Sequence, residues 1–549
     1  MSDFDLSLLQ DTVIQYISRS QYGEAMVCIK AFAEQIINDP ESIGVVFASR
    51  ELDSLCRMLA DTYYANHRHV PEGTPQGTVI LATELVRAGG HVELIKDYLA
   101  LGLFESPVRV VMTDLFNRLD HDSVKEWESR LDCEVFMATE TTLDGKLDCL
   151  VERFAEWNPA TVLSFGHNQD VVCIVAAHAP CAINRYYVHH GDHHLSLGVT
   201  CEAFQHVDLH NMSFQLCKHE IGVMQQLYWP ISTVGTPQIK NRFLDRGAVT
   251  TCSCGRMSKF ESGTYAFHYE RAVASILKAS RGYHVHIGDL TDAFLQRIHK
   301  ELDAENVDHD RFIHIPWVDS LSRALIENGV DVYVSSFPLG GGKSLIEAMS
   351  VGVPVVTHES YRSRYHSGSD LTYPESHIWS EYEDLARIFK LFDEPLLQQH
   401  SAFALQHFES YYSKGAFLKA FASGSEGADL VPPLHTYHRN QLQNHLDIKR
   451  QRLQEIEPLI AEKNRLFQEW KHVLSAYNEH VETIGTQQAV IEQLTEQRLA
   501  LIEQLAEEKR ALNEQLTQEK HAFEALVIAQ QNASLKGRIR RIARVLLNK

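Results

Sequence analysis

Three consecutive glycines, Gly340 to Gly342, stand directly before Lys343 and Ser344, and Glu347 follows three residues later. A mostly apolar run, 330–334, precedes the glycines, and helix-forming residues follow them. The pattern predicts a strand, a loop and a helix. Glycines let a backbone approach a ligand closely, and the free N–H groups at a helix N-terminus attract anions. We therefore expect an anionic ligand here, with a nucleoside diphosphate as the first candidate.

Two other interpretations of this segment were weighed. A P-loop places a glycine six residues before its Lys-Ser pair, and that position here is Phe337, so the spacing excludes it. A tight strand-to-helix turn without a ligand stays open, although such a turn needs one glycine rather than three.

The segment resembles the donor-nucleotide motif in the C-terminal half of GT-B glycosyltransferases. That resemblance implies a phosphate-facing loop and a ribose-binding carboxylate, with the residues Gly340, Gly341, Gly342, Lys343, Ser344 and Glu347 in these roles. The large retaining family has a second glutamate eight residues before the first, where this chain has Leu339. The difference favours the branch of inverting O-GlcNAc and HMW1C-like transferases, whereas residues 345–349 resemble the larger family. The stereochemical outcome stays open.

Basic residues follow the first strand expected in the second half of the chain. Gly255 to Lys259 comes directly after the apolar stretch 248–252. GT-B transferases commonly place basic side chains there against the donor diphosphate, and fixed positive charge stabilises a departing nucleotide. We expect Lys259 to fill this role, and Arg256 after it. The alternative is a surface pair on a solvated loop.

In the first half, Gly89, Gly90 and His91 stand at the first expected strand-to-helix junction. His91 is the candidate catalytic base, since imidazole titrates near neutrality. A capping or surface histidine is the alternative. His167 and Asn168, which follow the stretch 161–165, are weaker candidates of the same kind.

A histidine-rich run follows the stretch 185–189, and we expect it to point into the same cleft. From this run, Asp192 is a candidate catalytic residue, and His190 and His193 are candidate substrate contacts. A divalent ion was considered because His and Asp are good ligands. Adjacent residues cannot all converge on one ion, however, and the resemblance implies no essential metal, so no metal site is expected.

The alternation of expected strands and helices predicts an α/β fold with two Rossmann-like domains in series and the active site between them. The expected strands are 78–85, 108–112, 161–165, 185–189, 248–252, 283–287 and 311–315. The expected domains are an N-terminal helical cap (1–72), an acceptor domain (75–235), a nucleotide-sugar-binding domain (236–435), a coiled coil (436–533) and a basic amphipathic helix (534–549).

The last two segments carry different signals. An eleven-residue repeat of Glu-Gln-Leu begins at 492, 503 and 514, which favours a coiled coil and a homo-oligomer over a solitary helix. Residues 535–549 combine apolar helical spacing with six Lys or Arg, which favours an anionic membrane surface. A coiled-coil terminus or a partner-binding helix is the alternative.

Composition narrows the class of protein. The chain has 549 residues and a net charge of -21, which argues against general nucleic-acid binding. The ten cysteines lack a disulfide framework and favour reducing cytosol, and Cys252-Ser253-Cys254 gives only a weak zinc signal. With no long apolar segment, we expect a cytoplasmic protein, peripheral at most on the inner face of the plasma membrane.

The resemblance to GT-B transferases implies a metal-independent glycosyltransferase of the hexosyl- or N-acetylhexosaminyl type. It would need no cofactor beyond its donor substrate, a UDP-sugar in the first instance, and would act on a glycan, lipid-linked glycan or protein acceptor near a membrane. Two alternatives stay open. One is a GT-B nucleotide-sugar epimerase, and the other is a coiled-coil tether with a transferase-like binding module that lacks turnover.

Overall fold

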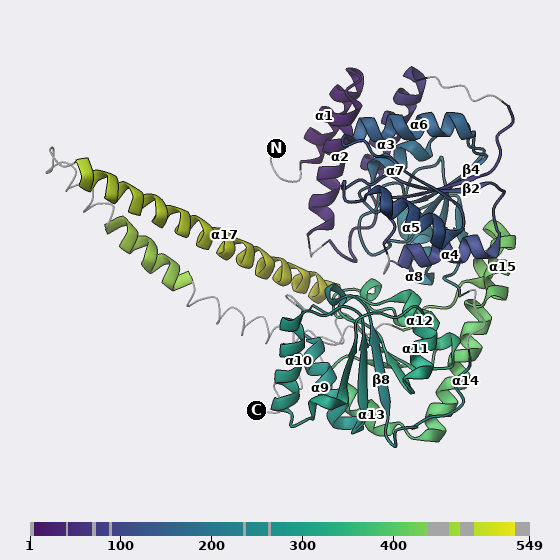
Figure 1. The fold of residues 1–549 in the computed structure, drawn as a ribbon, viewed down its shortest axis with the longest axis vertical. Helices are drawn as coiled ribbons and strands as arrows, with labels where there is room; N and C mark the ends of the chain where they lie inside the picture. Colours follow the sequence, from purple (N-terminus) through teal and green to yellow (C-terminus); the bar gives the residue numbers. More distant parts are fainter. Residues whose placement is uncertain are drawn as a thin grey trace. The chain divides into compact units, whose positions relative to one another are not determined.

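The computed structural model describes residues 5–39, 42–67, 73–86, 90–233, 238–261, 265–436, 460–472 and 488–532 (Figure 1). The chain forms two compact units. The first contains residues 1–262 and 267–438, and the second contains 263–266 and 439–549. Gly89 and the basic segment 534–549, both named above, lie outside the described residues.

The first domain is built on a parallel sheet with the strand order β3-β2-β1-β4-β5-β6-β7 within the described residues. Its two central strands, β1 and β4, are buried on both faces, because helices cover both sides of a parallel sheet. The strands are β1 (Thr78–Ala82), β2 (Val108–Met112), β3 (Glu134–Met137), β4 (Thr161–Phe165), β5 (Asn184–His189), β6 (Gln205–Asp208) and β7 (Gln226–Tyr228).

The second domain has a parallel sheet of order β10-β9-β8-β11-β12-β13. In each sheet, the second and third strands lie on one side of the first strand, and the later strands lie on its other side. This is the Rossmann order. The expected pair of Rossmann-like domains is therefore confirmed. The strands are β8 (Thr250–Cys254), β9 (Tyr283–Ile287), β10 (Phe312–Ile315), β11 (Val332–Val334), β12 (Val355–His358) and β13 (His377–Trp379).

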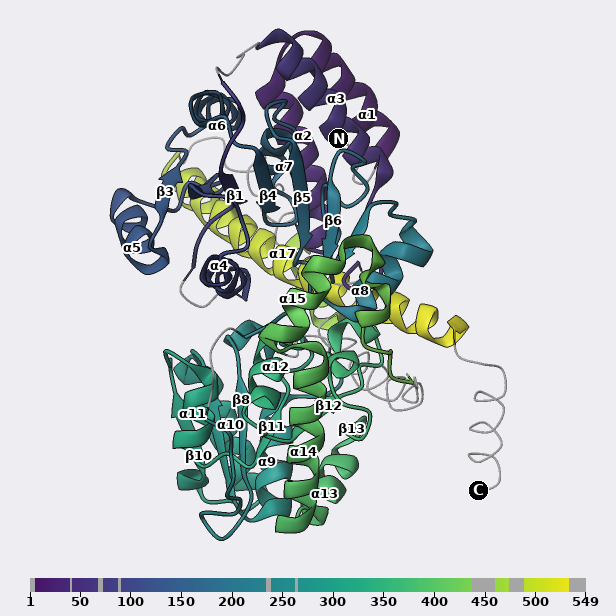
Figure 2. The ribbon, with the colours of Figure 1, turned by 90° about the vertical axis from the view of Figure 1, so that its right-hand side faces the viewer.

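Helices flank both sheets, as Figures 1 and 2 show. Those of the first domain are α4 (Gly90–Leu101), α5 (His121–Leu131), α6 (Leu143–Trp157), α7 (Val171–Ala177), α8 (Asn211–Leu216) and the π-helical turn η1 (Cys217–Ile221). Those of the second are α9 (Tyr269–Ser280), α10 (Asp292–Ala304), α11 (Leu321–Glu327), α12 (Gly342–Ser350), α13 (Tyr382–Leu391) and α14 (Glu394–Tyr411).

The N-terminal helices α1 (Leu6–Ser18), α2 (Tyr22–Ile37) and α3 (Arg50–Asn66) share one apolar core with the first sheet. Leu9 and Leu55, for example, belong to the same cluster of buried side chains as Val79 of β1. The α3 residue Asp53 also accepts a hydrogen bond of 2.6 Å from the backbone N–H of Gly198. The segment expected as a separate cap is thus a layer of the first domain.

The end of the first unit returns to the first domain. Helix α15 (Lys414–Ser423) and the 3-10 segment η6 (Gly424–Leu430) pack against β7. The rings of Phe421 and Trp229 lie 4.9 Å apart, and the Asn211 side chain donates to the carbonyl of Pro432 at 3.2 Å. The expected boundary at residue 435 places α15 and η6 in the second domain, whereas both segments pack against β7 of the first domain.

The second unit contains a helical stretch, 460–472, and the 45-residue helix α17 (Gln488–Asn532). Helix α17 carries the eleven-residue repeat, and Leu499, Ile502 and Leu516 are exposed along it. The coiled coil and its oligomer stay predictions. Among the described helices, none is both long enough and apolar enough to cross a membrane.

Candidate functional site

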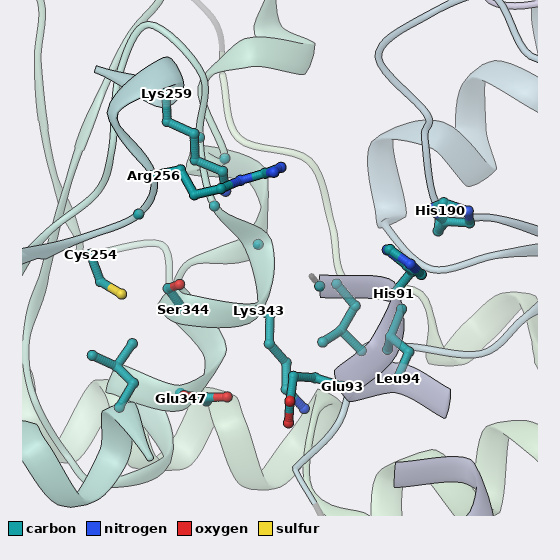
Figure 3. Close-up of a pocket in the computed structure, with 18 of the residues that line it drawn as sticks. His91, Glu93, Leu94, His190, Cys254, Arg256, Lys259, Lys343, Ser344 and Glu347 are labelled. Atoms are coloured by element: carbon teal, nitrogen blue, oxygen red, sulfur yellow. The ribbon is translucent and has the colours of Figure 1, made fainter. Parts of the chain in front are cut away.

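A cavity of about 680 Å³ lies between the two Rossmann-like domains of the first unit (Figure 3). The loops after β8 and β11 and helix α12 form one wall, and helix α4 with the loops after β4, β5 and β6 forms the other. These positions are the points where the strand order reverses, at which open α/β sheets bind ligands. Of the predicted residues, the cavity wall includes Gly90, His91, Asn168, His190, Asp192, His193, Arg256, Lys259, Gly340, Gly341, Gly342, Lys343, Ser344 and Glu347.

The glycine loop is tightly enclosed. A Cβ atom at Gly340 would lie 2.9 Å from the carbonyl oxygens of His366 and Ser367. A Cβ atom at Gly342 would lie 2.8 Å from Nε2 of His210. Helix α12 begins at Gly342, and its preceding residue is also a glycine, so within the described structure no side chain caps the first turn. The N–H groups of that turn are available to an anion.

Lys259 and Arg256 extend toward the glycine loop from the end of β8. A Cβ atom at Gly341 would lie 3.1 Å from Nζ of Lys259, so the ammonium group lies over the loop. Burial lowers the pKa of Lys259, and the neighbouring Arg256 lowers it further, while Cys254 opposes the shift. Both basic side chains line the same cavity as the glycine loop, and Figure 3 shows them next to each other.

The first βα turn of the second domain also depends on close backbone approach. Gly255 has a φ of +154° and Gly288 a φ of +138°, values that favour glycine. A Cβ atom at Gly288 would lie only 2.1 Å from the carbonyl oxygen of Gly255. This contact sets the direction in which the chain leaves β8, and with it the placement of Arg256 and Lys259.

Glu347 projects from α12 one turn after the glycine loop, with Ser344 and Cys254 beside it in the cavity wall (Figure 3). Burial raises the pKa of Glu347 to about 7, against the opposing effect of Lys343. Its carboxyl group consequently changes charge near neutral pH. A ligand that donates hydrogen bonds favours the ionised form, because a carboxylate accepts with both oxygens.

Lys343 differs from its expected role. Its ammonium group forms an ion pair with Asp97 of α4 and also donates to the carbonyl oxygen of Ser232 at 2.5 Å. The lysine lines the cavity, but its charge is held by the opposite domain rather than left free for a phosphate. Sequence alone gave no signal for Asp97, because the pairing joins residues 246 positions apart.

The opposite wall carries two neutral histidines, His91 and His190, and His167 packs against His91 without lining the cavity. The His91 ring stacks on the His190 ring at 5.4 Å and meets the His167 ring edge-on at 5.5 Å. Burial lowers the pKa of all three, to about 3 for His190 and about 4 for His167. Nε2 of His91 lies 2.9 Å from the Glu84 carbonyl oxygen, which can only accept, so Nε2 carries the proton. The lone pair of His91 is then on Nδ1.

Asn168, which follows β4, contacts the neighbouring histidine-rich loop that follows β5. The Asn168 amide donates to the carbonyl oxygen of Gly191 at 2.8 Å and to Ser196 Oγ at 2.6 Å. A Cβ atom at Gly191 would lie 2.1 Å from the Asn168 amide oxygen. Asn168 therefore holds the histidine-rich loop in place, while His193 from that loop reaches the cavity.

Asp192 is largely buried in the cavity wall and pairs with His210, which also lines the cavity and was not among the predicted residues. Its carboxylate accepts from Nδ1 of His210 at 2.5 Å, and the charge of His210 holds the pKa of Asp192 well below its usual range although burial opposes this. Nε2 of His210 faces Gly342 and has no hydrogen-bond partner in the described part of the chain. His210 follows β6, so its place after a strand was the available signal.

The site combines three chemical features. One wall presents free backbone N–H groups and two cations, which suits a diphosphate. The same wall presents one carboxyl group a helical turn away, which suits a ligand hydroxyl. The facing wall presents neutral imidazoles, one of which has a lone pair available to accept a proton.

No protein-family model and no curated protein matches this sequence. Solved structures are similar at low identity. HepE of Anabaena, solved with UDP and glucose, is 12% identical over 63% of this chain and 98% of its own, with a TM-score of 0.47. A Thermobaculum terrenum O-GlcNAc transferase mutant is 13% identical over 78% and 85%, with a TM-score of 0.42. A Rickettsia africae glycosyltransferase is 12% identical over 64% and 98%, with a TM-score of 0.46. The function of this chain is therefore inferred from its own residues.

Proposed function

We propose that this chain is a glycosyltransferase that moves a sugar from a nucleoside-diphosphate sugar to a glycan, lipid-linked glycan or protein acceptor. The observation that carries the proposal is the joint placement of an uncapped glycine loop, two cations and a carboxyl group in one cavity, opposite neutral histidines. A UDP-sugar is the donor to test first, as the resemblance to GT-B transferases implies.

In this account the donor diphosphate lies along Gly340 to Gly342 and receives hydrogen bonds from the first turn of α12. Arg256 and Lys259 stabilise the negative charge that grows on the nucleotide as the sugar leaves, which lowers the barrier. Glu347 accepts hydrogen bonds from the ribose hydroxyls. His210 contacts the donor from the far side of the loop, held in orientation by Asp192.

Transfer also requires that the acceptor hydroxyl lose its proton. We assign this step to His91, since it is neutral and its Nδ1 carries the lone pair. His190 and His193, with Gly90, would contact the acceptor from the same wall. The two basic side chains supply the charge that a divalent ion supplies elsewhere, so we expect added magnesium or manganese to leave the rate unchanged.

The proposal is tested by incubating the full chain with UDP-, GDP- and CMP-sugars, with the free sugars as controls. Thermal stabilisation by one nucleotide sugar and release of its nucleotide with an acceptor are the expected results. No stabilisation by any nucleotide sugar would contradict donor binding. Binding without turnover would favour the binding module, and conversion to an epimer without acceptor would favour the epimerase.

We further propose that residues 436–533 assemble this protein into a homo-oligomer and that 534–549 contacts an anionic membrane surface on the cytoplasmic side. The exposed apolar side chains of α17 support the first part. Light scattering of the full chain measures its mass, and a monomer would contradict the oligomer. Co-sedimentation with anionic vesicles tests the membrane contact of residues 534–549. If a chain that ends at Asn532 binds the vesicles as well as the full chain does, this contact is contradicted.

A further inference from the structure

A cluster of four possible metal ligands lies inside the first domain, beneath the cavity wall formed by its loops. His189 ends β5, His206 and Asp208 belong to β6, and Cys217 begins η1. Their exposed fractions are 0%, 2%, 0% and 0%. One potential ligand atom from each lies within 4.8 Å of the other three. Four donors of three kinds thus converge on one point in the interior.

Three of the six distances between these atoms are close to those of a tetrahedral zinc site, and all six are within 4.8 Å. With Zn–N near 2.0–2.1 Å and Zn–S near 2.3 Å, tetrahedral geometry separates two N or O ligands by about 3.3 Å and an N from an S ligand by about 3.6 Å. Asp208 Oδ1 lies 3.2 Å from His189 Nδ1 and 3.2 Å from His206 Nε2. Cys217 Sγ lies 3.6 Å from His189 Nδ1.

A plain hydrogen-bonded network explains these contacts only in part. Nδ1 of His189 is within hydrogen-bond range of both Asp208 Oδ1 and Cys217 Sγ, yet one ring nitrogen carries either one proton or one lone pair and serves only one of them well. His206 Nε2 lies within 3.2 Å of Asp208 Oδ1, yet among the described residues it has no hydrogen-bond partner. Two ligands of one ion approach each other in this way without a proton between them. A divalent ion with one carboxylate, one thiolate and two neutral imidazoles also has no net charge, so it satisfies the buried carboxylate at little electrostatic cost.

The surroundings of Asp208 fit the same interpretation. Its other oxygen, Oδ2, accepts a hydrogen bond of 2.6 Å from the Gln226 side chain, which also donates to the Phe214 carbonyl oxygen at 2.7 Å. An outer contact of this kind fixes the orientation of a ligating carboxylate. Asp208 is therefore held with a single oxygen facing the other three ligands.

We propose that His189, His206, Asp208 and Cys217 bind one structural zinc ion. Four protein ligands and complete burial leave no open position for a substrate, which is the arrangement of a structural rather than a catalytic site. The ion would tie the ends of β5 and β6 to η1. The loop with His190 to His193 follows β5 directly, and His210 follows β6, so the ion would position the acceptor-side wall of the cavity.

No metal site is expected from the sequence, in which only Cys252-Ser253-Cys254 gives a weak zinc signal. Among the described residues those two cysteines are not part of a metal-ligand group. The proposed ligands were not recognised because they are spread over the chain, with 28 positions between His189 and Cys217. The parallel pairing of β5 with β6 brings His189 beside Asp208, and no local sequence pattern records that contact. The zinc site does not depend on the transferase proposal, because its test measures bound metal rather than enzymatic activity.

The test is to purify the full chain and measure its metal content by mass spectrometry, with Cys217→Ser beside Cys173→Ser. Cys173 is a matched control, since it is equally buried in the same domain but outside the cluster. We expect about one zinc ion per chain in the wild type and in Cys173→Ser, and little in Cys217→Ser. Chelation should lower the Tm of the wild type and leave that of Cys217→Ser unchanged.

Cobalt supplies a second measurement that needs no variant. Full-length protein reloaded with cobalt should show thiolate-to-metal charge transfer in the near ultraviolet and the visible bands of tetrahedral cobalt. This spectrum decides the question even if Cys217→Ser does not fold. A wild type that binds neither metal, a cobalt spectrum without the thiolate band, or a folded Cys217→Ser with full zinc content would overturn the proposal.

Discussion

Replacing Lys259 by methionine removes the cation over the glycine loop and keeps a side chain of similar length. The ammonium group would lie 3.1 Å from a Cβ atom at Gly341, so it is within reach of a diphosphate that follows the loop. A hydrogen bond to a charged group contributes about 1.5–3 kcal/mol. Because about 1.4 kcal/mol is tenfold in affinity, UDP should bind about 10–100 times more weakly to Lys259→Met.

This loss would not come from unfolding. Burial lowers the pKa of Lys259, so the folded protein holds that proton less tightly than the unfolded chain does. The resulting cost to stability is full below the folded pKa and is relieved as pH rises through it. A neutral methionine removes the cost, so the Tm of Lys259→Met at neutral pH should equal or exceed that of the wild type.

Titration calorimetry with UDP measures the effect. Lys278→Met is the matched control, because Lys278 belongs to the same domain but is exposed and pairs with Glu305 on the surface. The control should bind UDP like the wild type. A Lys259→Met protein that binds UDP within about threefold of the wild type would refute the assignment of Lys259 to the donor.

Gly342→Ala should weaken UDP binding and lower the free energy of unfolding by about 1–3 kcal/mol, because its new methyl group would lie 2.8 Å from Nε2 of His210. Gly90→Ala is the control, since a Cβ atom there has no neighbour within 4 Å. Calorimetry with UDP and thermal melts should show no change for this control. Glu347 has a pKa of about 7, so UDP-glucose should bind more tightly at about pH 8 than at about pH 6, and Glu347→Gln should lose this dependence; an unchanged pH profile would contradict the ribose contact. Asp97→Asn removes the partner of Lys343 and should lower the free energy of unfolding by no more than about 3 kcal/mol, because both side chains keep some exposure. A denaturant melt equal to that of the wild type would show that the ion pair does not contribute to stability.

The central strands were predictable because their sequence signal is local. The expected strands 108–112, 161–165 and 283–287 coincide with β2, β4 and β9, each of which is five residues long and has β-branched or aromatic residues at several positions. Four strands were missed, namely β3 (Glu134–Met137), β6 (Gln205–Asp208), β7 (Gln226–Tyr228) and β13 (His377–Trp379). They are short and carry polar residues, so the sheet around them rather than their own composition makes them strands.

The cavity wall that carries the glycine loop was predictable for the same reason. Its glycines, Lys259 and Glu347 belong to two short segments, each a strand followed by a loop and a helix, and the order of strands in the second sheet brings both loops to one edge. What sequence could not give is pairing across the cleft. The contact of Lys343 with Asp97 depends on how two domains meet, which no local pattern records.

The first domain shows the same limit. His210 was missed because the strand before it was missed, and its partner Asp192 was therefore expected to act directly. The segment 1–72 was expected to be helical, as α1 to α3 are, yet a helical pattern does not say which surface the apolar face of each helix covers. The return of α15 to β7 likewise depends on tertiary packing alone.

The most direct test of donor binding is an experimental structure of the full chain with UDP. The account predicts that the diphosphate lies along Gly340 to Gly342, within hydrogen-bond distance of the first N–H groups of α12 and of Nζ of Lys259. It also predicts that the ribose hydroxyls meet Glu347. UDP bound outside this cavity, or bound in it with the diphosphate turned away from the glycine loop, would contradict the account.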